Sequence, residues 1–314
     1  MSIRAKAAGR AVVRWTSHVI DMATLTAVLL LVAFAGYALW DSDQIHREAD
    51  ATRHAIWKPT VDEGESFSQL RSINPDVFAW LTVYGTNIDY PVAQGSDNLK
   101  YVNTSAEGEY SLSGSIFLDY ENDPHFGDFN SVLYGHHMEK NAMFGDIGTF
   151  ADQATFDTHR FGNLFFDDAD HGIEFFAFIH TDAYDQDVFT AAVGDTQRQS
   201  VLDSLIAKAT HVRDVGVDAS DRLVLLTTCS SSSTNGRDIL VAVLTDQSFV
   251  DAFARPEAEF SRDGAGVDAR VDLLASAGPW IVVALLVGVA AVVVVVLKQR
   301  ARTRGRRGLE RGLV

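Results

Sequence analysis

Two long apolar runs without a charged residue divide this chain into segments. The first covers residues 22–40 and the second covers residues 273–297. A helix needs about 20 apolar residues to cross the roughly 30 Å hydrocarbon core of a bilayer, so both runs are long enough to be membrane spans. A buried core helix is the alternative for each. A cleaved signal peptide is a further alternative for the first run, because basic residues precede it and Ala33-Phe34-Ala35 resembles a cleavage site. We predict an uncleaved anchor, because the apolar part of a signal peptide is usually only about 7–15 residues long.

Charge is distributed unevenly along the chain, whose formal net charge is -16. Residues 1–40 hold four basic side chains and one acidic, and residues 298–314 hold seven and one, so the acidic excess lies between them. This excess argues against a nucleic-acid partner, because phosphate binding needs clustered Lys and Arg. Basic segments beside membrane spans lie on the cytoplasmic side. We therefore predict a cell-membrane protein with both termini in the cytoplasm and residues 41–272 outside the cell.

These features predict one external domain held by two anchors. The predicted parts are a basic tail at 1–21, a signal-anchor span at 22–40, a helical stalk at 41–66, a folded domain at 67–250, a linker at 251–272, a second span at 273–297 and a basic tail at 298–314.

The segment between the spans is rich in short strand patterns. Six stretches rich in β-branched and aromatic residues, bounded by Gly, Asn or Asp, are predicted as strands: 77–83, 115–118, 131–134, 173–180, 223–228 and 239–244. Apolar residues at helical spacing predict an amphipathic helix over 196–210, and shorter helices are predicted over 43–58 and around 143–154. Many non-local strands of this kind often close into a barrel, so we predict a single mainly-β domain.

Cys229 is the only cysteine of the chain, and it falls in the segment predicted to lie outside the cell. Disulfides are favoured there, yet this thiol has no intramolecular partner. A single external cysteine is an inert buried residue, an intermolecular link or a reactive nucleophile. The neighbouring residues must decide among these three interpretations.

Two adjacent histidines, His136 and His137, follow the predicted strand at 131–134. A histidine at a strand end can face a groove, but it is more often an ordinary surface or core residue. Neighbouring side chains in an extended chain point to opposite faces, and no Cys or His at a recognisable ligand spacing completes the pair. We therefore predict no metal site.

A strand, a polar loop and a second strand connect Cys229 to Arg237. If the two strands pair across the loop, the cysteine at the end of the first and the arginine at the start of the second come close in space. A nearby cation favours the thiolate, the nucleophilic form of cysteine, and guanidinium donors can hold a carbonyl oxygen or a developing oxyanion. The alternative is an ordinary arginine on a solvated loop.

Several segments together resemble the sortases, the membrane-anchored cysteine transpeptidases of Gram-positive bacteria. Residues 225–229 (LLTTC) are similar to the TLxTC signature of that family, with Leu225 in place of its first threonine. Gly135-His136 and Gly236-Arg237 match the segments of the catalytic His and Arg. Further segments resemble class B in content and order: 73–80, 85–91, 114–120, 134–138 and 143–146. A C-terminal span, in contrast, is commoner in the pilus-building class C.

The resemblance implies an eight-stranded β-barrel with short helices, flanked here by the two predicted spans. It implies that Cys229 attacks the backbone carbonyl of a sorting-signal peptide to give a thioacyl enzyme, that His136 serves first as general acid and then as general base, and that Arg237 orients the peptide and stabilises the oxyanion. The candidate substrate contacts are Thr228, Tyr134 and Asn130. The chemistry needs no metal and no organic cofactor, although some sortases bind calcium.

The resemblance also implies the partners. The donors would be secreted proteins with a C-terminal sorting signal, and the acceptor would be an amine of the peptidoglycan precursor or a pilin lysine. A donor that is itself held at the membrane meets an anchored enzyme at high effective concentration. Two alternatives stay open. One is a hydrolytic cysteine peptidase of the same fold, because acceptor access and water exclusion decide the fate of the intermediate. The other is a non-catalytic surface adhesin or accessory protein.

Overall fold

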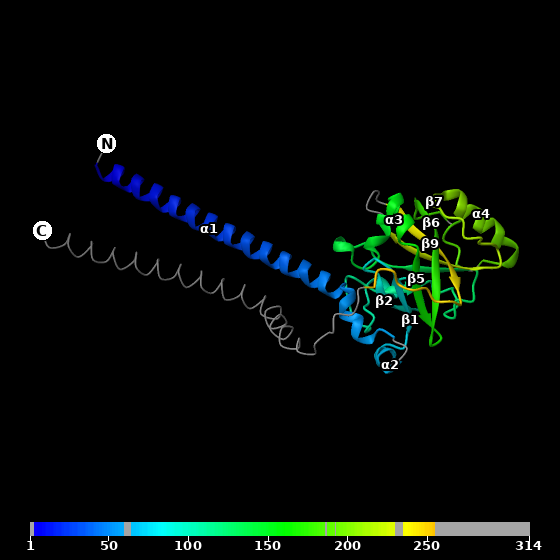
Figure 1. Ribbon diagram of the computed structural model, residues 1–314. Coiled ribbons are helices and arrows are strands. Elements are labelled where there is room, and N and C mark those ends of the chain that lie inside the picture. The colour runs from blue at the N-terminus through cyan, green and yellow to red at the C-terminus, as the bar shows by residue number, and fades with distance from the viewer. Residues whose placement is uncertain (1–2, 60–63, 186, 192, 230–234, 255–314) are drawn as a thin grey trace. The chain divides into compact units, whose positions relative to one another are not determined.

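The computed structural model describes residues 3–59, 64–185, 187–191, 193–229 and 235–254 (Figure 1). The chain divides into two compact units. All strands of the described residues lie in the unit Gln44–Ala258, and the N-terminal residues through Asp43 belong to the other unit.

The described residues contain α-helices, 3-10 helices (η) and nine strands. In chain order they are α1 Ile3–Glu48, η1 Ala51–Trp57, α2 Gly64–Ile73, β1 Val77–Val83, β2 Asp89–Gln94, η2 Lys100–Val102, β3 Ile116–Leu118, β4 Asn130–Tyr134, η3 Glu139–Asn141, η4 Gly145–Ala151, α3 Gln153–Thr158, β5 Phe161–Phe166, β6 Ala169–Asp182, η5 Asp195–Gln197, α4 Arg198–Lys208, β7 Ala209–Val212, β8 Arg222–Cys229 and β9 Gly236–Thr245.

The N-terminal helix α1 contains the first predicted span. Within the part of the chain that the structure describes, Val12–Trp57 is the one helical stretch long and apolar enough to cross a bilayer, and its apolar window is not buried. A signal sequence passes the same test of length and composition. The second predicted span, 273–297, and the basic tail that follows it lie outside the described residues.

The helix predicted over 43–58 is in fact two elements. α1 ends at Glu48, and the side chain of Asp50 then caps η1 by accepting a hydrogen bond from a backbone N–H. Between them, Ala49 is fully buried, and its carbonyl accepts a 2.7 Å hydrogen bond from the hydroxyl of Tyr90 on β2. Within the predicted stalk, Ala49 is therefore packed against the β domain.

The strands close into a barrel. Their order is β5-β1-β2-β3-β4-β8-β9-β6-β7, and an additional pairing of β5 with β6 joins the sheet to itself. The closed ring contains eight strands, and β7 pairs beside β6 as a ninth strand outside the ring. The pairs β2–β3 and β4–β8 are parallel, and the other pairs are antiparallel. The predicted mainly-β, eight-stranded barrel with short helices is confirmed.

Alternate residues of β8 belong to two different apolar clusters, as expected for a strand buried on both faces. Val224 and Leu226 lie in the cluster that fills the barrel. Leu223 and Leu225 lie in a second cluster, which includes the buried face of α4. Complete burial of each leucine contributes roughly 1.5–3 kcal/mol to folding. A third cluster on the outside of the barrel includes residues of α2.

The helix predicted around 143–154 is also split in two. The 3-10 helix η4 ends at Ala151, and α3 begins at Gln153. Asp152 separates them, because its side chain accepts a hydrogen bond from the backbone N–H of Thr155 and so caps α3. The helix predicted over 196–210 corresponds to α4, and its last two predicted residues, Ala209 and Thr210, are the first two of β7.

Candidate active site

The end of β8 and the start of β9 bring Cys229 and Arg237 together. The two strands pair antiparallel, and Cys229 is the Cα partner of Arg237 at the last position of this register. Residues opposite each other in an antiparallel pair have Cα atoms about 4.5–5.5 Å apart. The predicted pairing across the loop is therefore confirmed. The loop residues 230–234 lie outside the described residues.

β4 brings His136 to the same end of the barrel. It runs parallel to β8, with Tyr134 as the Cα partner of Thr227. Directly after the strand, the backbone N–H of Gly135 donates a 3.2 Å hydrogen bond to the carbonyl of Thr227. His136 follows at once, two residues beyond Tyr134, just as Cys229 lies two residues beyond Thr227. The three predicted catalytic residues thus come from the ends of three neighbouring strands, β4, β8 and β9.

Within the described residues, one hydrogen bond holds the ring of His136. Its Nε2 lies 2.8 Å from the carbonyl oxygen of Val102, the last residue of η2. A carbonyl oxygen only accepts, so Nε2 carries a proton in this contact and Nδ1 of the neutral ring keeps its lone pair. No carboxylate of the described residues forms an ion pair with His136. Nδ1 is therefore the nitrogen available to exchange a proton with a reacting group.

Gly135, the residue before His136, packs closely against the side chains of Ile116 and Phe144. A Cβ atom at this position would lie 2.5 Å from Cδ1 of Ile116 and 2.7 Å from Cδ2 of Phe144. Both distances are shorter than a carbon–carbon contact tolerates. The requirement for glycine is thus one of packing, and it fixes the path of the chain into His136.

Arg237 donates one side-chain hydrogen bond within the described residues. The side chain is partly exposed, and its Nη1 donates a 3.0 Å hydrogen bond to the carbonyl of Gly236. No carboxylate of the described residues forms an ion pair with it. A guanidinium has five N–H donors, and within the described residues only Nη1 has an acceptor, so the others can meet a ligand without breaking a described contact.

Tyr134 belongs to a partly buried group of polar side chains next to the site. Its hydroxyl donates a 2.9 Å hydrogen bond to Oδ2 of Asp119, and the same oxygen accepts 2.8 Å from the side-chain amide of Asn98. Burial, and then the charge of Asp119, raise the pKa of Tyr134 far above its ordinary value, while the nearby Arg237 acts in the opposite direction. The hydroxyl stays protonated, and its proton is already donated to Asp119. What Tyr134 offers a ligand in this conformation is mainly its ring.

Thr228 faces a different set of neighbours. It is the Cα partner of Asp238, whose carboxylate lies 2.7 Å from Nδ1 of His180 on β6. Thr228 is only 2% exposed, and its hydroxyl has no hydrogen-bond partner within the described residues. It is therefore closed to a substrate in this conformation. Sequence reasoning did not single out Asp238 and His180, because only the pairing of β6 with β9 brings them together.

Asn130 does not lie with the other candidates. It begins β4, and its Cα partner on β8 is Leu223. Four residues of strand, about 13 Å, separate it from Tyr134. Its side chain is fully buried and donates a 2.8 Å hydrogen bond to the carbonyl of Thr190. Asn130 thus stabilises the fold at the end of β4 opposite to the one that precedes His136.

The adjacent His137 lies in the loop that follows β4. It forms an isolated bridge with Met143. Over the described ranges, no group of three or more His, Cys, Asp or Glu residues is arranged to hold a metal ion.

Comparison with protein-family models gives one family for the region that holds this site. A model described as a sortase domain matches residues 81–245. This range contains all of β2 to β9, together with Cys229, His136 and Arg237.

Individual proteins agree with this match. Sortase B of Staphylococcus aureus is 33% identical over 181 residues, which cover 56% of this chain and 73% of that protein. A solved structure of sortase B from the type II pilus of Streptococcus pneumoniae is 44% identical, with a TM-score of 0.51, and the match covers 58% of this chain and 99% of that one. A Streptococcus pyogenes class B sortase involved in pilus biogenesis is 40% identical, with a TM-score of 0.53 and the same two coverages.

Proposed function

The chain belongs to the sortase family, whose members are cysteine transpeptidases, and we propose that Cys229, His136 and Arg237 carry out this reaction here. Within the family, the chain resembles class B. Class B enzymes act in the anchoring of cell-wall proteins or in pilus assembly. The observation that carries the proposal is the register that places Cys229 opposite Arg237, beside the strand end that bears His136.

In the first half of the reaction, Cys229 acts as the nucleophile. Its sulfur attacks a backbone carbonyl carbon of the sorting signal, and the C–N bond of that peptide then breaks to leave a thioester on the enzyme. The departing amine needs a proton, which Nδ1 of a protonated His136 supplies. The C-terminal fragment of the donor leaves as a free amine.

In the second half, an amine acceptor resolves the thioester. The neutral ring of His136 takes a proton from the attacking amine through Nδ1, because Nε2 is held by the carbonyl of Val102. The C–S bond breaks, the thiolate of Cys229 leaves, and a new amide bond joins donor to acceptor. Proton balance is restored, since His136 ends as it began.

Arg237 stabilises the negative charge that develops in both halves. Its position opposite Cys229 brings its free donors to the carbonyl oxygen that becomes an oxyanion. The same positive charge favours the thiolate form of the nucleophile. The lack of an ion-pair partner among the described residues supports this role, because a paired guanidinium would have to exchange partners first.

We further propose that α1 anchors the enzyme in the cell membrane, with the barrel on the outer face. The apolar window of α1 and the basic residues before it support this orientation. The donor proteins would be secreted proteins with a C-terminal sorting signal. An enzyme and a donor that share one membrane meet in two dimensions, which raises their effective concentration.

Pilus assembly is the biological role that we propose. The two similar pilus enzymes are 44% and 40% identical to this chain, whereas Staphylococcus aureus sortase B is 33% identical. The acceptor would then be a pilin lysine. Anchoring to peptidoglycan precursor is the alternative, and it uses the same chemistry with a different amine.

Replacement of the chromosomal gene by Cys229→Ala tests the proposal in the cell. We expect the covalent high-mass ladder of pilin on a denaturing gel to disappear and the pilin monomer to accumulate. A ladder that survives the substitution contradicts pilus assembly by this enzyme. If the parent strain shows no ladder and the variant strain loses a single wall-linked protein, the result supports anchoring to peptidoglycan precursor instead.

A further inference from the structure

One face of α1 is less exposed than the rest of the helix. Within the apolar stretch 22–40, four side chains are partly exposed and every other residue is exposed; the four are Met22, Leu29, Ala33 and Trp40. The other leucines of the same stretch are 48–75% exposed: Leu25, Leu30, Leu31 and Leu39. The type of side chain therefore does not explain why Leu29 is covered and its neighbours are not.

The spacing of the four positions is that of a contact between two helices. They follow one another at intervals of seven, four and seven residues, an average period that keeps one stripe of a helix against a neighbour. The ring of Tyr37 on the same helix lies 5.9 Å from that of Trp40 and adds to its cover. A helix without a neighbour exposes all its faces alike, so the stripe formed by the four residues indicates that a segment packs along α1.

We propose that residues 273–297 pack along this stripe as a second membrane helix, antiparallel to α1. Within the described chain, α1 supplies all the residues of its compact unit, so the segment that covers the stripe lies outside the described residues. Residues 273–297 are uncharged, apolar and long enough to span a bilayer. This pairing rests on the proposed anchoring by α1 and gives that anchor a partner inside the membrane.

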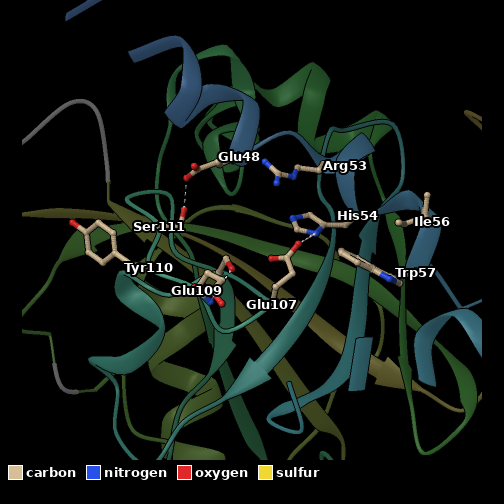
Figure 2. A pocket seen from close by; sticks show the side chains of 10 residues that line it. Glu48, Arg53, His54, Ile56, Trp57, Glu107, Glu109, Tyr110 and Ser111 are labelled. Carbon is tan, nitrogen blue, oxygen red and sulfur yellow. Dashed lines mark hydrogen bonds and ion pairs between the residues drawn. The ribbon is translucent and has the colours of Figure 1, made fainter. Parts of the chain in front are cut away.

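The folded domain holds the end of α1 at a fixed point. Glu48, the last residue of the helix, accepts a 2.9 Å hydrogen bond from the hydroxyl of Ser111 (Figure 2). The next residue, Ala49, is held by the hydroxyl of Tyr90 on β2. A helix rises 1.5 Å per residue, so Trp40 lies about 12 Å along the helix from Glu48.

The last described residues are held by the same β1–β2 hairpin. The carbonyl of Phe249 accepts a 2.9 Å hydrogen bond from the hydroxyl of Tyr84, in the turn that follows β1. Tyr84 and Tyr90 are six residues apart, and these residues span at most about 22 Å. The 18 residues 255–272 then span up to about 60 Å when extended. This length is sufficient for the run 273–297 to begin at the level of Trp40.

The midpoints of the two apolar runs give the register. They are residues 31 and 285, which lie at one depth if both runs are centred in the same bilayer. In antiparallel helices, the small residues Ala284 and Gly288 then fall within one residue of the level of the covered stripe positions. Small residues let the backbones of membrane helices approach closely. The resulting pairs are Ala33 with Ala284 and Leu29 with Gly288, and one further pair toward the cytoplasm is Met22 with Val295.

Disulfide formation in the full chain tests this pairing. Cys229→Ala removes the only thiol, so a pair of cysteines can be placed in a chain without any other. We expect Ala33→Cys with Ala284→Cys, and Leu29→Cys with Gly288→Cys, to form disulfides on mild oxidation in membranes of the expressing cells. A disulfide needs two Cα atoms within about 7 Å of each other. Trypsin releases the segments 15–47 and 271–298, and mass spectrometry shows whether they are joined.

Two matched pairs serve as controls. Ala35→Cys replaces Ala33→Cys beside Ala284→Cys, because Ala35 is exposed and lies on another face of α1. Leu29→Cys with Ala277→Cys keeps both helix faces but moves one thiol about 16 Å along the membrane normal. We expect about tenfold less disulfide in each control, because the two thiols cannot meet without backbone movement. Equal yields in control and predicted pairs overturn the pairing.

Other results separate the remaining possibilities. Ala33→Cys alone that forms a dimer of doubled mass on a non-reducing gel assigns the stripe to a second copy of the chain and overturns the pairing. If one predicted pair is not inserted, Met22→Cys with Val295→Cys replaces it, and absence of a disulfide in every inserted pair also overturns the pairing. Release of the parent chain from membranes by alkaline carbonate means that the proposed anchoring by α1 fails, and the pairing with it. Transpeptidation by the parent chain is measured separately, so the proposed reaction stands or falls without either result.

Discussion

Cys229 and Arg237 are Cα partners at the last paired position of β8 and β9. The pairing is fixed by the backbone ladder of two strands that are buried along most of their length. The separation of the two Cα atoms is thus set by the barrel and does not depend on how the loop 230–234 is arranged. A cation placed in this way is available in the resting enzyme as well as in the transition state.

The reactivity of the only cysteine should depend on Arg237. We expect Arg237→Gln to lower the rate of alkylation of Cys229 by iodoacetamide near neutral pH by about tenfold, because the cation that favours the thiolate is lost. Arg237→Lys keeps the charge and should restore part of the rate. Mass spectrometry of the intact chain follows the reaction without ambiguity, since there is one thiol. Equal rates in all three proteins contradict the electrostatic role.

Loss of the His136 imidazole should stop the reaction without unfolding the barrel. We expect His136→Gln to lower the rate of amide transfer by about 10²–10⁴-fold, the usual contribution of a general acid–base group. The glutamine amide can still donate to the carbonyl of Val102, so the thermal unfolding temperature should change little. The matched control is His125→Gln, an exposed histidine paired with Asp167. Its rate should equal that of the parent, and a similar loss in both variants contradicts a specific role for His136.

Gly135→Ala should destabilise the protein and also reduce its activity. The added methyl group would collide with Ile116 and Phe144, and overpacking of this kind costs about 1–3 kcal/mol of the free energy of unfolding. Gly194→Ala is the control, because its nearest neighbour would be 3.7 Å away, at Oε1 of Gln197. Thermal unfolding of both variants checks this expectation. A Gly135→Ala protein as stable as the control shows that the contact relaxes without cost.

Burial of His54 predicts a stability that falls with acid. Its folded pKa is lowered from 6.5, first by burial and also by Arg53, while Glu107 acts in the opposite direction. The unfolded chain therefore binds a proton first as the pH falls through 6.5, and stability declines from there toward the folded pKa. We expect His54→Gln to flatten the fall in thermal stability between about pH 7.5 and about pH 5.5. An unchanged slope in the variant means that other groups cause the acid sensitivity.

The six predicted strands are all present, and two of the three that were not predicted, β2 and β5, show why their sequences did not indicate strands. β2 contains Pro91, which argues against a central strand. The structure admits it because β3 begins to pair with β2 only at Val92, one residue later. β5 has large apolar residues on both faces, and its outward-facing Phe161 stacks on Phe249 at 4.2 Å. Phe249, which covers Phe161, is distant from β5 in the sequence, so no local sequence pattern predicts this contact.

The candidate site was predictable where it is local and not where it depends on distant contacts. The segments 225–229 and 134–138 pointed to Cys229 and His136, and the strand that follows the loop after Cys229 supplied Arg237, which the pairing of β8 with β9 places opposite the cysteine. The carbonyl of Val102 that holds His136 has no sequence signature, since any residue offers a carbonyl. Asn130 was a candidate substrate contact, but four residues of strand separate it from Tyr134 and place it at the other end of β4.

The most direct test is mass spectrometry of the full chain after incubation with a donor sorting-signal peptide, with and without an amine acceptor. The parent protein should gain the mass of the N-terminal part of the donor on Cys229, and the acceptor should convert this thioester into a free, amide-linked product. The Cys229→Ala protein should give neither species. A joined product that still forms with Cys229→Ala, or a parent protein that never carries the donor under conditions where the product accumulates, contradicts the account.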